Sequence, residues 1–576
     1  MDTAQISAQR TPSQLRQDPP GQDDVPKQLK VQNLNEWALY EVTVSQLQAH
    51  YAEGHFTAIE YTRFCLDRIH VINPYIEAVI ETNPDALLIA KRLDDERRGG
   101  KIRGPLHGVP ILIKDNIATK DSMQTTAGSW ALLGNIVPKD AFVISRLRDA
   151  GAVLLGKANL SEWASARSKN DSTGYSPRGG QARNPFNLRK TPHGSSSGSA
   201  VAVSANVVPL ALGTETDSSI IGPASMNGVV GIKPTVGLTS RSGVIPISEH
   251  MDTVGPFGRT VADAVAALDA IACRDDEDEY TMAPDRKQEG SYLSYVSTAE
   301  ALRGARFGLP MKRCWDKVPP GCKRVASRVL DAIRGAGAEI FEVDFPSVEE
   351  RVNEEGTWDW EHGEPAKSEF TVAKVDAYNG INAYLRSLRQ TPMRSIEDVI
   401  KYNRENAGTE GGVPGVAPAY PDGQDNFLEI AATKGVRDAT YRSALGHTRR
   451  QTRENGIDAA LNDNFREGIS VADGSSDSRA TMATPKALDA LLFCDRRGIG
   501  QQYAAQAGYP IICIPIGVDD GGIPVSLSVQ HTAWREADLV KWASAIEDLW
   551  NGENGWRATP TFRNLHAKNI PLELVD

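Results

Sequence analysis

The stretch Gly194-Ser195-Ser196-Ser197-Gly198-Ser199-Ala200 is the most informative part of this chain, and Gly213-Thr214-Glu215-Thr216-Asp217-Ser218-Ser219-Ile220 follows it closely. Both are glycine-flanked loops rich in hydroxyl side chains, and small apolar residues separate them. Upstream, Lys114 ends the apolar run Val109-Pro110-Ile111-Leu112-Ile113. Serines that need activation, a lysine at a strand end and glycine-rich backbone are the components of a serine hydrolase that uses lysine as its base.

The first loop allows three interpretations. Residues 194–198 match the GxSxG pattern, in which Ser196 would be the nucleophile of a strand–turn–helix elbow. That motif needs a buried strand before it, yet residues 184–193 contain two prolines and several polar side chains, which disfavour a central strand. A flexible linker fits poorly with the small apolar residues 200–211 that follow. A catalytic loop fits best, because glycine and serine let backbone N–H groups approach a developing oxyanion closely.

Lys114 has two interpretations. A lysine at the end of a strand ordinarily points into solvent. The run before Lys114 has no polar alternation, however, which predicts a strand buried on both faces. Burial lowers the pKa of a lysine from ~10.4 toward ~7–8, where the neutral amine serves as a base. The sequence therefore predicts that one serine relays a proton to Lys114 while the other attacks the substrate.

Composition restricts the class of protein. The 576 residues are 40% hydrophobic and 24% charged, which is typical of a globular chain. The net charge of −11 argues against nucleic acid as a partner. No run of ~20 apolar residues is present, so no membrane partner is expected. The six cysteines and ten histidines lack ligand spacing. We therefore expect no metal and no cofactor, and the scattered thiols favour a reducing, cytoplasmic location.

The pattern along the chain predicts an α/β fold. Residues 43–73 have the periodicity of two helices, with Thr57 as the N-cap of the second. Helix, glycine and strand then recur over 142–155 and again over 325–343. This repetition predicts a large, mixed, mostly parallel sheet covered by helices on both faces.

Two segments differ from this pattern. Residues 1–34 are rich in Gln, Pro, Asp and Ser and are expected to form a disordered tail, with residues 35–576 as a single domain. Residues 346–430 are polar and are interpreted as a substrate-side insertion. A peripheral helical decoration is the alternative interpretation of the same segment.

Taken together and in this order, the segments resemble the amidase signature family. The core motifs and residues 395–403 look most like the branch that contains bacterial peptide amidases and their fungal and plant relatives. The matching stretches are residues 108–115, 156–163, the Ser/Gly loop, residues 213–224 and residues 228–235.

The resemblance implies a Ser–cis-Ser–Lys triad. By motif position Ser219 is the nucleophile, Ser195 the cis-serine and Lys114 the base. Ser195 is expected to lie across a cis peptide from Ser196. The backbone N–H groups of residues Thr216, Asp217, Ser218 and Ser219 are expected to form the oxyanion hole. The implied activity is hydrolysis of a small-molecule or peptide carboxamide through an acyl-enzyme, without a metal or organic cofactor, and the resemblance is compatible with a homodimer.

Ser218 departs from the family pattern, which has glycine at this position. If the backbone there needs a positive φ, a side chain costs on the order of 1 kcal/mol. This departure permits one alternative to an active amidase, an impaired pseudo-amidase that acts as a binding protein. The resemblance leaves a second alternative within catalysis, the A subunit of a glutamyl-tRNA amidotransferase, which the expected disordered N-terminus, the acidic charge and the long insertion disfavour.

Overall fold

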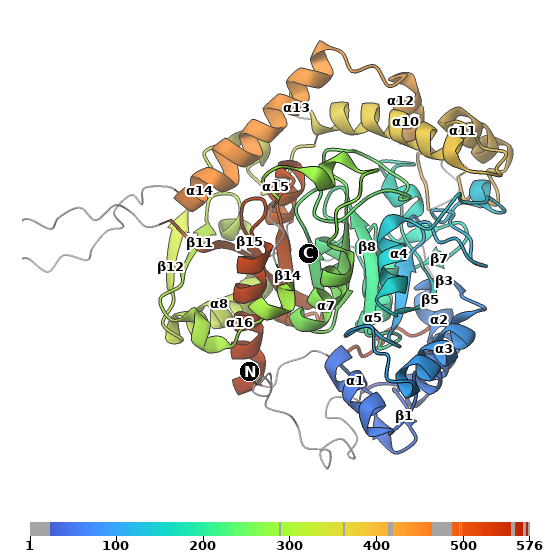
Figure 1. The fold of residues 1–576 in the computed structure, drawn as a ribbon. Coiled ribbons are helices and arrows are strands. Elements are labelled where there is room, and N and C mark those ends of the chain that lie inside the picture. Colours follow the sequence, from blue (N-terminus) through green and yellow to red (C-terminus); the bar gives the residue numbers. More distant parts are fainter. Residues whose placement is uncertain are drawn as a thin grey trace, which may run out of the picture.

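An 11-stranded sheet forms the centre of the computed structural model, which describes residues 24–286, 290–360, 363–412, 419–462, 487–494, 496, 498–554, 559–567 and 572–573. Strands from the first and the last parts of the chain meet in this sheet (Figure 1). From edge to edge they are β12 (Glu339–Val343), β11 (Arg306–Pro310), β13 (Ala490–Cys494), β15 (Pro524–Gln530), β14 (Ile511–Val518), β9 (Val230–Lys233), β10 (Thr253–Gly258), β8 (Leu210–Glu215), β4 (Pro110–Lys114), β5 (Val153–Ala158) and β3 (Val79–Thr82).

The sheet is mixed, as the sequence predicts. The strands β12, β11 and β13 pair in parallel, and so do β8, β4 and β5. These are the two regions where helix, glycine and strand recur in the sequence. Between them the strands from β13 to β8 pair antiparallel, and β3 adds an antiparallel edge. The repetition does not reveal this antiparallel centre, because β9 and β14 also follow a helix that ends at a glycine, Gly228 and Gly508, although both strands pair antiparallel with their neighbours.

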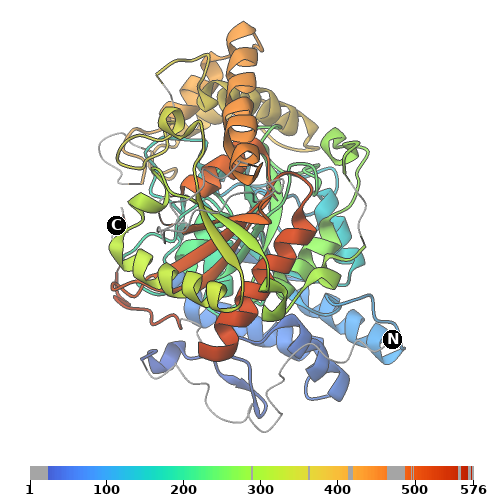
Figure 2. The same ribbon diagram turned by 90° about the vertical axis from the view of Figure 1, so that its left-hand side faces the viewer.

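Helices cover both faces of the sheet (Figure 2). The two clusters in which alternate side chains of β14 pack show the same arrangement. Ile511 and Cys513 pack in the cluster that includes α5 (Ser197–Ser204) and α6 (Ile221–Asn227). Ile512, Ile514 and Ile516 pack with α7 (Val261–Ile271), α8 (Pro320–Gly335) and α16 (Glu536–Asn554). Because successive side chains of a strand point to opposite faces, the two helical layers lie on opposite sides of the sheet.

The N-terminal helices form where the periodicity predicts them. The helix α1 (Val44–Glu53) begins with a capping box on Thr43, and α2 (Ala58–Ile76) begins with one on Thr57. In each, the threonine hydroxyl accepts a hydrogen bond from the backbone N–H three residues on, and the side chain of that residue accepts one from the threonine N–H. Both bonds satisfy backbone donors that have no partner within the first turn of a helix. The helices α3 (Ala86–Arg98) and α4 (Phe142–Asp149) complete this part of the fold.

The predicted tail of residues 1–34 is too long. Within its last part, Leu29 is fully buried and its carbonyl accepts a 2.6 Å hydrogen bond from the Arg68 guanidinium. A short pairing of β1 (Asn33–Leu34) with β2 (Trp37–Ala38) follows. Residues 24–34 therefore pack on the fold, while residues 1–23 lie outside the described part of the chain. None of the helices that the structure describes is long and apolar enough to cross a membrane.

The insertion is helical and continues beyond its predicted end at residue 430. Figure 1 shows α10 to α13 as a layer above one end of the sheet. Two further α-helices, α13 and α14, follow residue 430 among the described residues, and the next described strand of the sheet is β13. The helices of this region are α9 (Val348–Arg351), α10 (Glu369–Ser387), α11 (Ile396–Glu405), α12 (Asp425–Ala432), α13 (Ala439–Thr452) and α14 (Asp458–Asn462), and α15 (Ile499–Ala507) follows β13.

Candidate functional site

Lys114 is the last residue of β4, and every residue of that strand is buried. The Lys114 ammonium lies 2.8 Å from Ser195 Oγ, 2.9 Å from Thr214 Oγ1 and 3.1 Å from the Thr214 carbonyl. Burial lowers the pKa of Lys114 to about 7, although the negative charges of Glu215 and Asp252 oppose the shift. The predicted buried lysine is confirmed, and its amine is poised to exchange a proton near neutral pH.

The first loop brings Ser195 between Lys114 and the second loop. Ser195 Oγ donates a 2.9 Å hydrogen bond to Ser219 Oγ, and Ser195 and Ser219 are 1% and 8% exposed. A cis peptide is present, but it joins Gly194 to Ser195 and not Ser195 to Ser196 as expected. The expected position was one bond too late, because a sequence motif marks the serine and not which of its two peptide bonds is cis.

Ser196 faces away from the other hydroxyls. Its Oγ donates to the Thr214 carbonyl at 3.0 Å and accepts from the Thr214 N–H at 3.3 Å, which fastens the loop to β8. The next residues start α5, and Gly198 lets this turn approach neighbouring backbone, since a Cβ there would lie 2.3 Å from the Ala78 carbonyl oxygen. No strand precedes the loop among the adjacent residues 182–196, so the elbow interpretation of Ser196 lacks its structural context.

The second loop closes into a tight turn between β8 and α6. Glu215 Oε2 accepts the backbone N–H groups of Ile220 at 2.6 Å and Ile221 at 2.9 Å, so one carboxylate joins the two ends of the turn. Ser218 has a φ of 56°, in the left-handed region that favours glycine. Within the described part of the chain, no hydrogen bond engages the backbone N–H groups of residues 216–219. The turn that contains Ser219 thus leaves these backbone N–H groups available as donors.

Three charged residues around these loops, Asp252, Lys233 and Glu369, were not singled out in the sequence. Asp252 accepts the hydroxyl of Thr216 at 2.6 Å. Lys233, at the end of β9, donates to the Tyr509 carbonyl at 2.7 Å, and burial lowers its pKa to about 8. Asp217 has a pKa well above its ordinary value, because burial and then the nearby Glu369 disfavour its charged form. Lys233 lies within a motif that the sequence analysis quoted, whereas Asp252 and Glu369 give no local signal.

Comparison with known proteins identifies the family. Residues 60–404 match the family model described as Amidase. The chain belongs to the amidase family. A Schizosaccharomyces pombe protein named as an amidase is 46% identical over 546 residues, which is 94% of this chain and 90% of the relative. The crystal structure of the peptide amidase from Stenotrophomonas maltophilia has a TM-score of 0.78 and 39% identity, covering 91% of this chain and 99% of that one.

The family membership confirms the resemblance drawn from the motifs, and with it an amide-hydrolysing enzyme on the amidase fold. The A subunit of glutamyl-tRNA(Gln) amidotransferase from Chloroflexus aurantiacus is a more distant relative, 33% identical over 89% of this chain and 97% of its own length. The amidase of S. pombe and the peptide amidase structure are both more similar to this chain than that subunit is.

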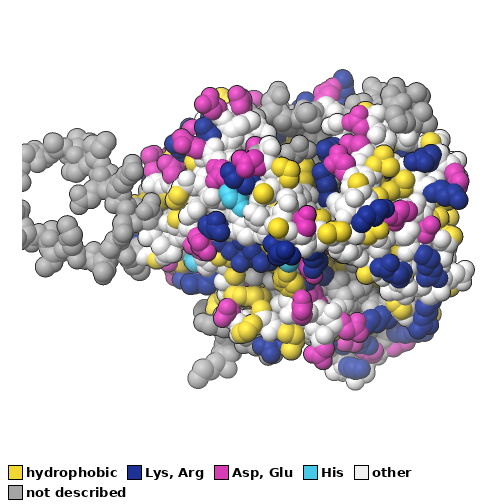
Figure 3. Space-filling view, turned by 90° about the horizontal axis from the view of Figure 1, so that it is seen from above, with side chains coloured by type: hydrophobic (Ala, Val, Ile, Leu, Met, Phe, Trp, Pro, Cys, Tyr) yellow, Lys and Arg dark blue, Asp and Glu magenta, His cyan; other side chains and the backbone are white. Residues whose placement is uncertain are grey.

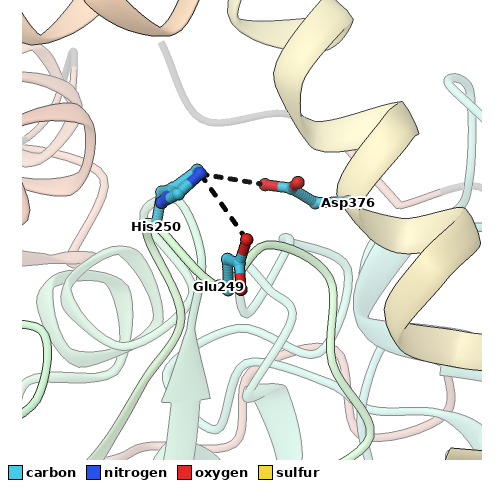
Figure 4. A group of neighbouring side chains, drawn as sticks. All are labelled: Glu249, His250 and Asp376. Carbon is cyan, nitrogen blue, oxygen red and sulfur yellow. Dashed lines mark ion pairs between the residues drawn. The ribbon is translucent and has the colours of Figure 1, made fainter. Parts of the chain in front are cut away.

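One cluster has the composition of a metal site. Glu249, His250 and Asp376 place ligand atoms within 4.8 Å of one another (Figure 4). Both His250 nitrogens already meet tyrosine hydroxyls, those of Tyr280 at 2.5 Å and Tyr441 at 2.9 Å. Burial and four nearby arginines lower the pKa of His250 to about 3. Lys and Arg side chains also gather in a band across the face on which α10 to α13 lie (Figure 3). Such surroundings disfavour a cation, so these residues are better described as a hydrogen-bonded network.

Proposed function

We propose that this amidase hydrolyses a linear carboxamide through an acyl-enzyme on Ser219. The observation that carries the proposal is the hydrogen-bonded series from Lys114 Nζ to Ser195 Oγ, 2.8 Å, and from Ser195 Oγ to Ser219 Oγ, 2.9 Å. Two hydroxyls and an amine in this order can pass a proton away from one oxygen and return it to a leaving group. The lowered pKa of Lys114 keeps a useful fraction of its amine neutral near pH 7.

In the proposed reaction, Ser219 Oγ forms a bond to the amide carbonyl carbon as its proton passes to Ser195, whose own proton passes to Lys114. The negative charge on the carbonyl oxygen is stabilised by the backbone N–H groups of residues 216–219, which is ordinarily the largest single contribution in acyl transfer. The C–N bond then breaks, and the proton returns through Ser195 to the departing ammonia or amine. Water attacks the ester by the same relay and releases the carboxylic acid.

The proposed substrate class is a peptide amide or a smaller carboxamide. The similarity to the S. maltophilia peptide amidase over 91% of this chain supports this choice. It is tested by incubating the purified chain with amidated peptides and with glutamine, without other subunits, and measuring ammonia. Ammonia released from the amidated peptides and not from glutamine supports the proposal. Activity that appears only after an amidotransferase partner is added would instead favour the A-subunit alternative.

A fluorophosphonate probe tests the proposed nucleophile separately. The probe phosphonylates an activated serine, so we expect a single adduct in the intact mass and, after digestion, on the peptide that contains Ser219. Prior incubation with an amide substrate should slow the labelling. An adduct on Ser195 or Ser196 would contradict the assignment, and a chain that carries no adduct would favour the pseudo-amidase alternative.

Ser218→Gly is expected to stabilise the fold without loss of activity. Ser218 has φ 56°, and a Cβ in this region costs roughly 1 kcal/mol relative to glycine. The free energy of unfolding should therefore rise by up to about 1 kcal/mol, as measured by chemical denaturation, while kcat for ammonia release stays equal or increases. A drop in kcat of tenfold or more would show that the Ser218 side chain contributes to the turn and is not merely tolerated.

A further inference from the structure

One face of the insertion helix α10 carries two buried acids and a glycine. Glu369, Asp376 and Gly380 are spaced by seven and then four residues, which places them on one face of a helix. Glu369 and Asp376 are each only 3% exposed. Burying a carboxylate destabilises the fold unless other groups bind it by hydrogen bonds or charge. The groups that bind these two carboxylates therefore indicate the role of this face of α10.

Asp376 connects α10 to Thr216 through a continuous hydrogen-bonded path. Asp376 Oδ2 accepts the Ser248 hydroxyl at 2.8 Å. The Ser248 N–H in turn donates to Asp252 Oδ2 at 3.0 Å, and Ile247 N–H donates to the same oxygen at 2.8 Å. The other oxygen of Asp252 accepts the Thr216 hydroxyl at 2.6 Å. Thr216 is the first of residues 216–219, so this path ends on the turn itself.

Glu369 is the other buried acid of this face, and its surroundings differ from those of Asp376. Trp358 Nε1 donates a 3.2 Å hydrogen bond to Glu369. The negative charge of Glu369 adds to burial in raising the pKa of Asp217.

Gly380 brings the helix into contact with the loop that carries this path. A Cβ on Gly380 would lie 2.8 Å from Cγ of Pro246. Real Cβ atoms do not approach other atoms so closely, so glycine permits α10 to lie directly on residues 246–252. Two separate contacts, one polar at Asp376 and one steric at Gly380, therefore fix α10 against the loop that supports the turn.

We propose that α10 is the scaffold that aims the oxyanion turn, with Asp376 as a positioning residue that acts through Ser248, Asp252 and Thr216. This inference rests on the proposed function, because it assumes that the N–H groups of residues 216–219 bind the oxyanion. The insertion would then do more than cover the substrate: its docking would complete the catalytic geometry. A displacement of about 1 Å in such a group is enough to cost ~10²-fold in rate.

The test compares variants of α10 in the full-length chain. For Asp376→Ala and Gly380→Ala we expect kcat for amide hydrolysis to fall by about 10- to 100-fold, with KM changed by less than about threefold. Asp376→Asn keeps an oxygen that accepts the Ser248 hydroxyl, so it should recover most of the kcat that Asp376→Ala loses. Gly380→Ala is the mildest change and serves if the polar variants fold poorly.

Lys374→Ala is the matched control. Lys374 is on the same helix but pairs with Glu429 of α12 instead of the turn. It should leave kcat within about threefold, and the small loss of stability expected of a partly exposed ion pair shows what an α10 contact away from the turn contributes. A loss of stability with unchanged kcat in Asp376→Ala and Gly380→Ala would overturn the inference, and so would a change confined to KM. Labelling of wild-type Ser219 by the fluorophosphonate probe shows independently whether the proposed function holds.

Discussion

Lys114→Met is expected to lower kcat/KM for amide hydrolysis by at least 10²–10⁴-fold, the usual contribution of a positioned general base. The substitution preserves length and apolar packing within the buried strand β4 but removes the amine that meets Ser195 Oγ at 2.8 Å. Ammonia release measures the loss. In the wild type, kcat/KM should rise with pH through an apparent pKa near 7, because only the neutral amine accepts the proton. A variant with near-normal turnover would remove Lys114 from the mechanism.

The same substitution should alter how stability depends on pH. The pKa of Lys114 is about 7 in the folded chain, below the 10.5 of an unperturbed lysine. Between these values the unfolded state binds more protons, so the wild type gains stability as pH rises from 7 toward 10.5 and pays the full cost of burying the charge below pH 7. Lys114→Met lacks this dependence. Relative to the wild type it should therefore become more stable as pH falls from 10 to 7, measured by denaturant unfolding at several pH values.

Lys157→Met is the matched control for Lys114. Lys157 lies in the adjacent strand β5, is equally buried, and has a pKa lowered by burial to about 8. Its amine donates to the Ile117 carbonyl and to Thr125 and not to either serine of the relay. The variant should show a similar change in the pH dependence of stability, yet keep kcat within about tenfold. Comparable losses in both variants would attribute the effect of Lys114→Met to the fold instead of to catalysis.

The candidate site could be found in the sequence because its chemistry is local to motifs. Lys114 ends an unbroken apolar run, and Ser195 and Ser219 lie in loops whose glycines and hydroxyls stand out from their surroundings. Their meeting in space follows from β4 and β8 being parallel neighbours, since the ends of adjacent parallel strands lie at the same edge of the sheet. The unusual Ser218 was also visible, because the family pattern has glycine where this chain has a left-handed serine.

What the sequence could not supply are the partners that meet only through the tertiary fold. Asp252 reaches Thr216 across 36 residues, and Asp376 reaches Ser248 across 128. Neither carboxylate belongs to a motif, and a buried acid on an insertion helix has the same local pattern as one on a solvated face. The predicted end of the insertion, residue 430, is too early because local sequence does not reveal which layer a helix joins. Amphipathic helices such as α13 look alike whether they cover the sheet or extend a separate layer.

Ser219→Ala is expected to reduce hydrolysis by on the order of 10⁴-fold or more, because removing the nucleophile of a covalent mechanism leaves only binding and oxyanion stabilisation. The fluorophosphonate adduct should disappear in the same variant, while the free energy of unfolding changes by less than about 1 kcal/mol, since Ser219 Oγ is bound by one neighbouring hydroxyl and weakly by the Asp217 carbonyl. Retained turnover or retained labelling would show that another residue attacks the substrate.

Ser196→Ala tests which of the two serine loops supplies the nucleophile. The elbow interpretation makes Ser196 the nucleophile, whereas its hydroxyl here bonds only to the backbone of Thr214 and does not meet Ser219. We therefore expect this variant to keep kcat within about tenfold.

The effects of groups that act as one unit are strongly non-additive. Adding Lys114→Met to Ser219→Ala should therefore lower kcat little beyond the loss in Ser219→Ala alone. If the two losses multiplied, the amine and the hydroxyl would be acting independently, and a relay through Ser195 would no longer account for their spacing.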